Sequence, residues 1–152
     1  MTMLPRAGYA AGAMVGGVVI DALLRRTGSK WWSRSAVGAA ALVLAGLSPL
    51  LAMFMTYPTA ALAVLASGVT MAGLAGPATW AAMMDLGGKS STSVMAVLNM
   101  SGNVGAFLCP VAVGTILDAF PERWSLVLLM FSIVYITGGI CWLLTDTQKP
   151  TR

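Results

Sequence analysis

Residues 35–84 contain no charged side chain. An apolar run of this length is too long for one transmembrane helix, which needs about 20 residues, and it suits two. Residues 56–59 divide the run, because their proline fits the first turn of a helix and their tyrosine is typical of the membrane interface. We therefore expect transmembrane helices at 35–55 and 59–84, in a fold that is set by a lipid bilayer.

The rest of the chain has the same apolar character. Hydrophobic residues make up 58% of the sequence and charged residues 9%, whereas soluble domains carry about 25% charged residues. Further apolar segments at 7–24, 93–117 and 124–144 bring the expectation to about five spans. The expected fold class is all-α, a polytopic helical membrane bundle in one domain over residues 1–152. Segments 35–55 and 124–144, which have few polar groups, are expected to face lipid over much of their surfaces.

Basic residues concentrate after the first apolar segment, at Arg25, Arg26, Lys30 and Arg34. Loops rich in Lys and Arg stay on the cytoplasmic side of a membrane. Alternation from this loop places the amino terminus outside and the carboxy terminus in the cytoplasm. The inside cations would then be Arg25, Arg26, Lys30, Arg34, Lys89, Lys149 and Arg152, against Arg6 and Arg123 outside. A cleaved signal peptide is a weaker interpretation of residues 1–24, because its cations would precede the apolar segment.

Several functions lack the residues that they need. The sequence has no histidine, and its two cysteines, Cys109 and Cys141, lie far apart in apolar runs, so a zinc or redox site is not expected. Every acidic residue falls at an expected interface, which leaves no convergent pair for catalysis inside the membrane. We expect no enzyme, no cofactor, no metal and no nucleic-acid partner, since topology explains the net charge of +4.

Two groups of residues inside the spans need a partner. Asn99 and Asn103 share one helix face, and a carboxamide is costly in hydrocarbon unless it is hydrogen-bonded. They either bond to another helix or line a polar cavity that handles a substrate, and both interpretations stay open. Gly8, Gly12 and Gly16 recur at a four-residue spacing, which favours close packing of two helices over a role in lining a substrate path.

These motifs resemble those of a transporter family. The loop residues Gly17, Asp21, Arg25, Arg26, Gly28 and Lys30 resemble the loop motif of the major facilitator superfamily, in its second copy between the eighth and ninth helices. Segments 76–89, 99–105 and 110–114 resemble the tenth and eleventh helices of the anion:cation symporter branch, whose members carry organic acids such as sugar acids. The resemblance covers essentially the whole chain, which corresponds to the eighth to twelfth helices of such a carrier.

The resemblance implies a carboxy-terminal segment of a secondary active transporter, with a partial major facilitator fold in the inner (plasma) membrane of a bacterium. In such carriers the substrate lies between two halves near the bilayer midplane. Trp80, Asn99 and Asn103 resemble positions near that cavity, and the loop residues resemble a conformational latch with Asp21 and Arg25 as its charged pair. The implied partners are the lipid bilayer, a small organic anion with a coupling ion, and an amino-terminal half.

Without that half the chain is expected to be inactive alone. A truncated gene product, a fragment or one part of a split carrier would each explain its length. The alternative is a structural or regulatory membrane subunit that packs against another chain through the faces of Gly8, Gly12 and Gly16.

Overall fold

All regular elements in the computed structural model, which describes residues 3–145, are helices. Side chains are described from residue 6 onward. The elements in chain order are α1 (Met3–Thr27), η1 (Trp31–Ala36), α2 (Val37–Ala52), α3 (Pro58–Gly87), η2 (Gly88–Ser90), α4 (Ser91–Ala119) and α5 (Trp124–Leu143). The all-α class is therefore confirmed over the described residues.

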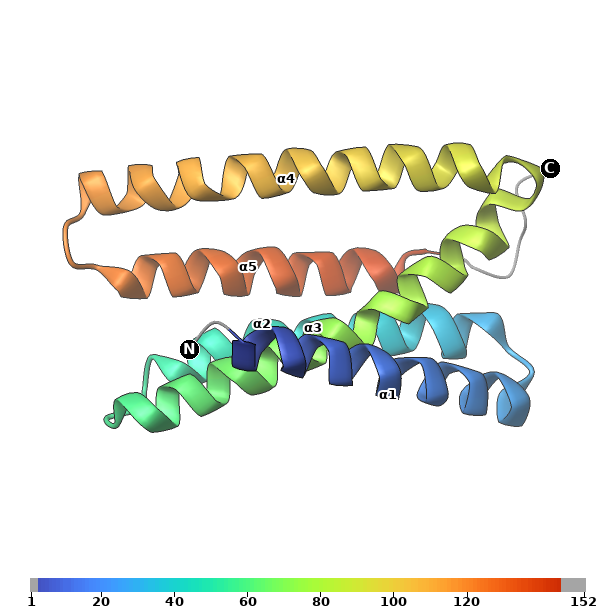
Figure 1. The fold of residues 1–152 in the computed structure, drawn as a ribbon, viewed down its shortest axis with the longest axis horizontal. Coiled ribbons are helices and arrows are strands. Elements are labelled where there is room, and N and C mark those ends of the chain that lie inside the picture. The colour runs from blue at the N-terminus through green and yellow to red at the C-terminus, as the bar shows by residue number, and fades with distance from the viewer. Residues whose placement is uncertain (1–2, 146–152) are drawn as a thin grey trace.

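Within the described residues, four helical stretches are long and apolar enough to cross a membrane: Arg6–Thr27, Trp31–Ala52, Pro58–Ala119 and Trp124–Leu143. The third is 62 residues long and comprises α3, η2 and α4. Figure 1 shows that the chain reverses at η2, so that α4 does not continue the line of α3. These lengths and compositions are those of a helical membrane protein.

The helices extend beyond the sequence-based segments. α1 runs through Arg25 and Arg26 to Thr27, although its segment was expected to end at residue 24, and α3 runs through Asp85 to Gly87, beyond the expected end at residue 84. Cations in the last turn of α1 interact favourably with the helix dipole, which explains why that helix continues through them. The second span also begins earlier than expected. The π-helix η1 starts at Trp31 and leads into α2, whereas the sequence predicted a start at residue 35.

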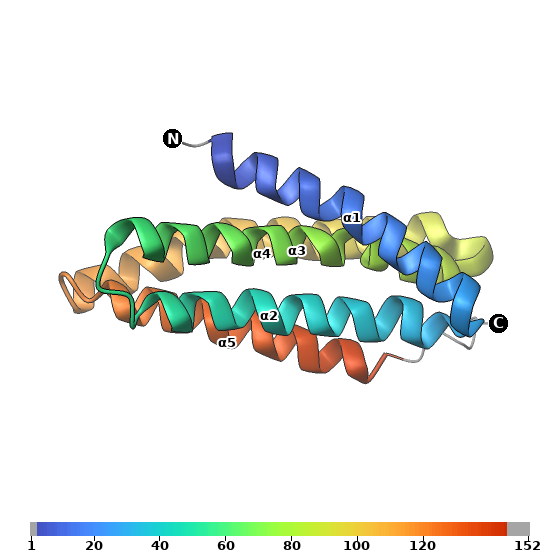
Figure 2. The same ribbon diagram turned by 90° about the horizontal axis from the view of Figure 1, so that it is seen from below.

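Small residues bring α1 and α3 into backbone contact. A Cβ atom placed at Gly12 would overlap the carbonyl oxygen of Thr70, and one at Gly16 would meet the carbonyl oxygen of Leu74. Gly73 of α3 lies in the same way against the carbonyl of Tyr9. The close packing expected at the glycine repeat is confirmed, and its partner is α3 of the same chain (Figure 2).

α2 lies at the centre of the packed helices, between α3 and α5. Gly46 of α2 meets the backbone of Ser132 in α5, and Gly68 of α3 meets the side chain of Ser48 in α2. The buried apolar core consists largely of alanines: Ala39, Ala41, Ala45, Ala52, Ala75, Ala78 and Ala82, with Ile20 and Val127. Membrane helices associate through such small residues because lipid supplies no hydrophobic driving force between them.

The expectation that segment 35–55 faces lipid over much of its surface was wrong. Half of the α2 span (50%) is buried, against 17% for each of the other three stretches. Ala39, Ala41, Ala45, Ala52 and Gly46 pack inward, while Leu44 and Leu51 stay exposed. For α5 the expectation agrees with the exposure of Ile133 and Val134.

α4 is the helix that packs least. None of its residues is buried, and Gly102, Gly105 and Gly114 have no atom within 4 Å of the position of an added Cβ. Large apolar side chains such as Met100 and Phe107 are also exposed. Figure 1 shows α4 at one edge of the molecule, with α5 between it and the α1–α3 layers in that view.

Candidate functional site

A hollow of about 410 Å³ lies between α1, α3 and α4. All three residues that the sequence singles out for a cavity, Trp80, Asn99 and Asn103, line it. Tyr9 of α1 and Leu42 of α2 complete its walls from the other helices. The fold therefore gathers these predicted residues, which belong to two different helices, around one space.

The hollow offers hydrogen-bonding groups but no charge. Asn99 and Asn103 each present a carboxamide that can both donate and accept hydrogen bonds, and neither makes one within the described part of the chain. The hydroxyl of Thr79 is occupied, because it donates to the carbonyl of Ala75 at 3.0 Å. No Lys, Arg, Asp or Glu is among its lining residues. The hollow is chemically suited to a hydroxylated or amide-bearing molecule.

A second hollow, of about 390 Å³, adjoins the first and shares Leu42, Thr79, Met83 and Leu98 with it. It lies between α2, α3, α4 and α5, and apolar side chains dominate its lining. The hollow that holds the two asparagines therefore continues into an apolar groove beside α4. The weak packing of α4 accounts for both spaces.

The loop motif lies at one end of the molecule, where α1 turns into η1. Gly28 has a φ of +64°, a left-handed conformation that suits glycine, and its N–H donates to the carbonyl of Leu24 at 2.9 Å. Asp21, Arg25 and Arg26 are exposed on the preceding helix. No ion pair between Asp21 and Arg25 forms in residues 3–145, although the two share a helix face.

The ion pairs at this end involve a different acid, Asp85. Lys30 donates from Nζ to Asp85 Oδ1 at 2.8 Å, and Arg34 donates from Nε to Asp85 Oδ2 at 3.2 Å. Asp85 is the one charged residue of α3, so both bonds join that helix to the start of the α2 span. Sequence reasoning placed Asp85 just after the expected 59–84 segment, at a membrane interface, and missed this cluster. The available signal was an isolated acid on the expected cytoplasmic side, where four cations also lay.

Buried serines fix η1 on both sides of this cluster. The hydroxyl of Ser33 donates to the carbonyl of Ile20 at 2.6 Å, which ties η1 to α1. The hydroxyl of Ser35 donates to the carbonyl of Thr145 at 2.8 Å, just after α5. One short π-helix thus connects the ends of α1, α3 and α5, and π-turns of this kind are frequent at functional sites.

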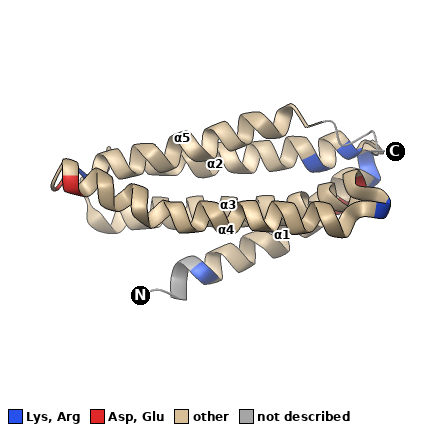
Figure 3. Ribbon diagram, turned by 90° about the horizontal axis from the view of Figure 1, so that it is seen from above, with Lys and Arg blue, Asp and Glu red and all other residues tan. Residues whose placement is uncertain are grey.

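Most of the described basic residues lie at one end of the molecule. Figure 3 shows Lys and Arg gathered at the end near the carboxy terminus, with acidic residues both there and at the opposite turn. The acids at the basic end are Asp21 and Asp85. That opposite turn joins α4 to α5 and contains Glu122 and Arg123, with Asp118 just before it. Among the described residues, no group of three or more His, Cys, Asp or Glu side chains is placed to hold a metal ion.

Comparison of the chain with protein-family models, with curated proteins and with solved structures found no match.

Proposed function

We propose that this chain is a carboxy-terminal segment of a secondary active transporter of the major facilitator type, which carries a small organic anion such as a sugar acid. The observation that carries the proposal is the single hollow lined by Trp80, Asn99 and Asn103. These residues are the ones whose motifs resemble the carrier cavity. In this proposal α3 and α4 cross the membrane separately, which gives five crossings with the amino terminus outside.

The chemistry of the hollow suits part of such a substrate. A sugar acid carries several hydroxyl groups, which the free carboxamides of Asn99 and Asn103 match as donors and acceptors. The indole of Trp80 adds an apolar surface and one N–H donor. The negative charge of the substrate needs a cation that this hollow does not contain, so the proposal assigns it to the amino-terminal half of the carrier.

The two charged motifs fit different parts of a rocking carrier. Asp85 holds Lys30 and Arg34 within this segment, so this cluster stabilises the segment itself. Asp21 is exposed and has no ion pair within residues 3–145. In the proposal Asp21 is therefore free to contact the other half in one state of the transport cycle.

The alternative function, a subunit that binds another chain through its glycine face, has less support. Gly8, Gly12 and Gly16 already pack against α3, so that surface is covered. The exposed face belongs instead to α4, which carries the two asparagines.

The test is uptake of a radiolabelled sugar acid by cells that express the chain alone or together with the amino-terminal half of a related carrier. Alone, the chain is expected to insert in the membrane without raising uptake above an empty vector. Co-expression is expected to restore uptake. Uptake by the chain alone, or co-purification of the two halves without any uptake of organic acids, would overturn the proposal.

A further inference from the structure

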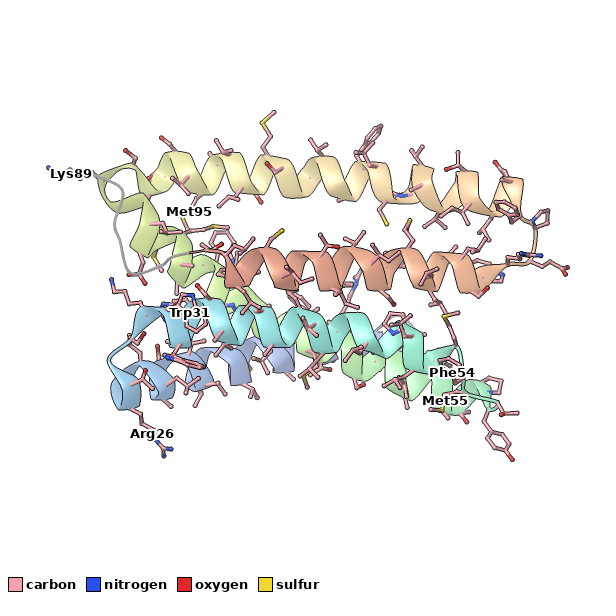
Figure 4. The ribbon with its side chains drawn as sticks, turned by 180° about the vertical axis from the view of Figure 1, so that it is seen from behind. Arg26, Trp31, Phe54, Met55, Lys89 and Met95 are labelled. Atoms are coloured by element: carbon pink, nitrogen blue, oxygen red, sulfur yellow. The ribbon has the colours of Figure 1, made fainter. Side chains whose placement is uncertain are left out.

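Arg25 and Arg26 lie beside this ion cluster and take no part in it within residues 3–145. Lys30 and Arg34 share the carboxylate of Asp85, at 2.8 and 3.2 Å. Arg25 and Arg26 are exposed in the last turn of α1, and neither forms an ion pair within the described residues. Figure 4 shows Arg26 pointing away from the bundle at this end. The guanidinium groups of these two consecutive residues, which line one hollow, are therefore available to an external anion.

The same surface of α1 is hollowed. Val18, Asp21, Ala22, Arg25 and Arg26 line a space of about 340 Å³ on the outside of the helix. Val18 precedes Arg25 by two helical turns, which places it about 10 Å further along the axis. The hollow thus has a cationic end at the terminus of the helix and an apolar end within the span.

The neighbouring aromatic residues lie where the membrane interface is expected. Trp31 and Trp32 follow the turn, with ring centroids 5.1 Å apart in an edge-to-face arrangement. Trp32 is 58% exposed. Exposed tryptophans are enriched at the level of lipid headgroups, so the two arginines lie beside that level and Val18 lies below it.

We propose that Arg25 and Arg26 bind the phosphate of an anionic phospholipid, whose acyl chain runs along Val18 and Ala22. Guanidinium groups bind phosphate oxygens in pairs of charge-assisted hydrogen bonds. Asp21, in the same hollow, opposes an anion. The Asp21 carboxylate would instead attract the ammonium group of a zwitterionic lipid with an amino headgroup. Asp21 therefore weakens the binding of an anionic lipid and strengthens the binding of such a zwitterionic lipid. The lipid site shares Asp21 with the contact that the transport proposal assigns to the other half. Lipid binding is measured on this chain alone, so its failure is distinguishable from a failure of the transport proposal.

The experiment is native mass spectrometry of the full chain in a neutral detergent, titrated with dioleoyl phosphatidylglycerol. Parallel titrations use phosphatidylcholine, phosphatidylethanolamine and inorganic phosphate. The variants are R25Q/R26Q and D21N. R123Q is the matched control, because Arg123 is an exposed cation in the turn at the opposite end. Circular dichroism of each variant verifies that the helices are retained.

The double variant is expected to bind the first phosphatidylglycerol molecule about thirtyfold more weakly. Each arginine near the membrane surface contributes about 1 kcal/mol to the binding of anionic lipid, and about 1.4 kcal/mol corresponds to a tenfold change in affinity. D21N is expected to tighten that binding, and R123Q and the phosphatidylcholine titration are expected to show no change. Unchanged phosphatidylglycerol affinity in the double variant, or an equal loss in R123Q, would overturn the proposal. A preference for phosphatidylethanolamine that D21N weakens, or displacement of the lipid by millimolar inorganic phosphate, would overturn it as well.

Discussion

Arg34 donates a 3.2 Å hydrogen bond from Nε to Oδ2 of Asp85, and both side chains are mostly buried, at 11% and 19% exposure. This bond joins η1 to the end of α3 across a long separation in the sequence. Lys30 bonds the other carboxylate oxygen but is 47% exposed, so water screens its contribution.

Replacing Asp85 with Asn should destabilise the protein, because it leaves the nearly buried guanidinium of Arg34 without a counter-charge. The expected loss in free energy of unfolding is about 1–3 kcal/mol. Thermal unfolding in detergent measures it. Asp118→Asn is the control, since Asp118 is exposed and forms no ion pair in residues 3–145. Equal stability of the two variants would show that the Asp85 cluster contributes nothing.

Replacing Gly12 with Leu should separate α1 from α3, because even a Cβ at Gly12 overlaps the backbone of Thr70. Overpacking of this kind costs about 1–3 kcal/mol or more. Gly17→Leu is the matched control on the same helix, where an added Cβ meets nothing within 4 Å. Unfolding in detergent is again the measurement. A Gly12 variant as stable as the Gly17 variant would contradict the packing of this seam.

Cysteine labelling distinguishes five crossings from four. The α2, α3 and α4 helices separate Ser29 from Pro121, so three crossings place these residues on opposite sides of the membrane. In a background without Cys109 and Cys141, a cysteine at Ser29 should react with an impermeant thiol reagent only from the cytoplasmic side, and one at Pro121 only from outside. Reaction of both from the same side would mean that the stretch Pro58–Ala119 does not cross twice.

The sequence predicts the class of fold well, because length and hydropathy alone determine whether a helix fits a membrane. It also predicts the glycine seam, since only small residues let two helix backbones approach as Gly12 and Thr70 do. The environment of α2 was not predictable from hydropathy. Alanine is apolar whether it faces lipid or another helix, and only the fold shows that Ala41 and Ala45 are buried.

Sequence reasoning singled out three residues that line the candidate hollow, but it did not predict how they are arranged. Asn99 and Asn103 attract attention because polar groups are costly inside a span, and Trp80 followed from resemblance. Their meeting in one hollow depends on the reversal at η2, which turns α4 back toward α3. The pairing of Asp85 with Arg34 rests on the same kind of long-range geometry, which a single sequence does not contain.

The role of the hollow is tested most directly by the affinity of a complete carrier that contains this segment. Asn99→Ala and Asn103→Ala are each compared with Met100→Ala, an exposed neighbour on α4 that does not line the hollow. Uptake is measured against substrate concentration at matched surface expression. Each asparagine variant is expected to lose about 1–3 kcal/mol of binding, a roughly five- to more than hundredfold weaker apparent affinity, with Met100→Ala unchanged. Wild-type affinity in both asparagine variants would contradict the account, and would leave the two residues as helix-packing groups worth about 0.6 kcal/mol each.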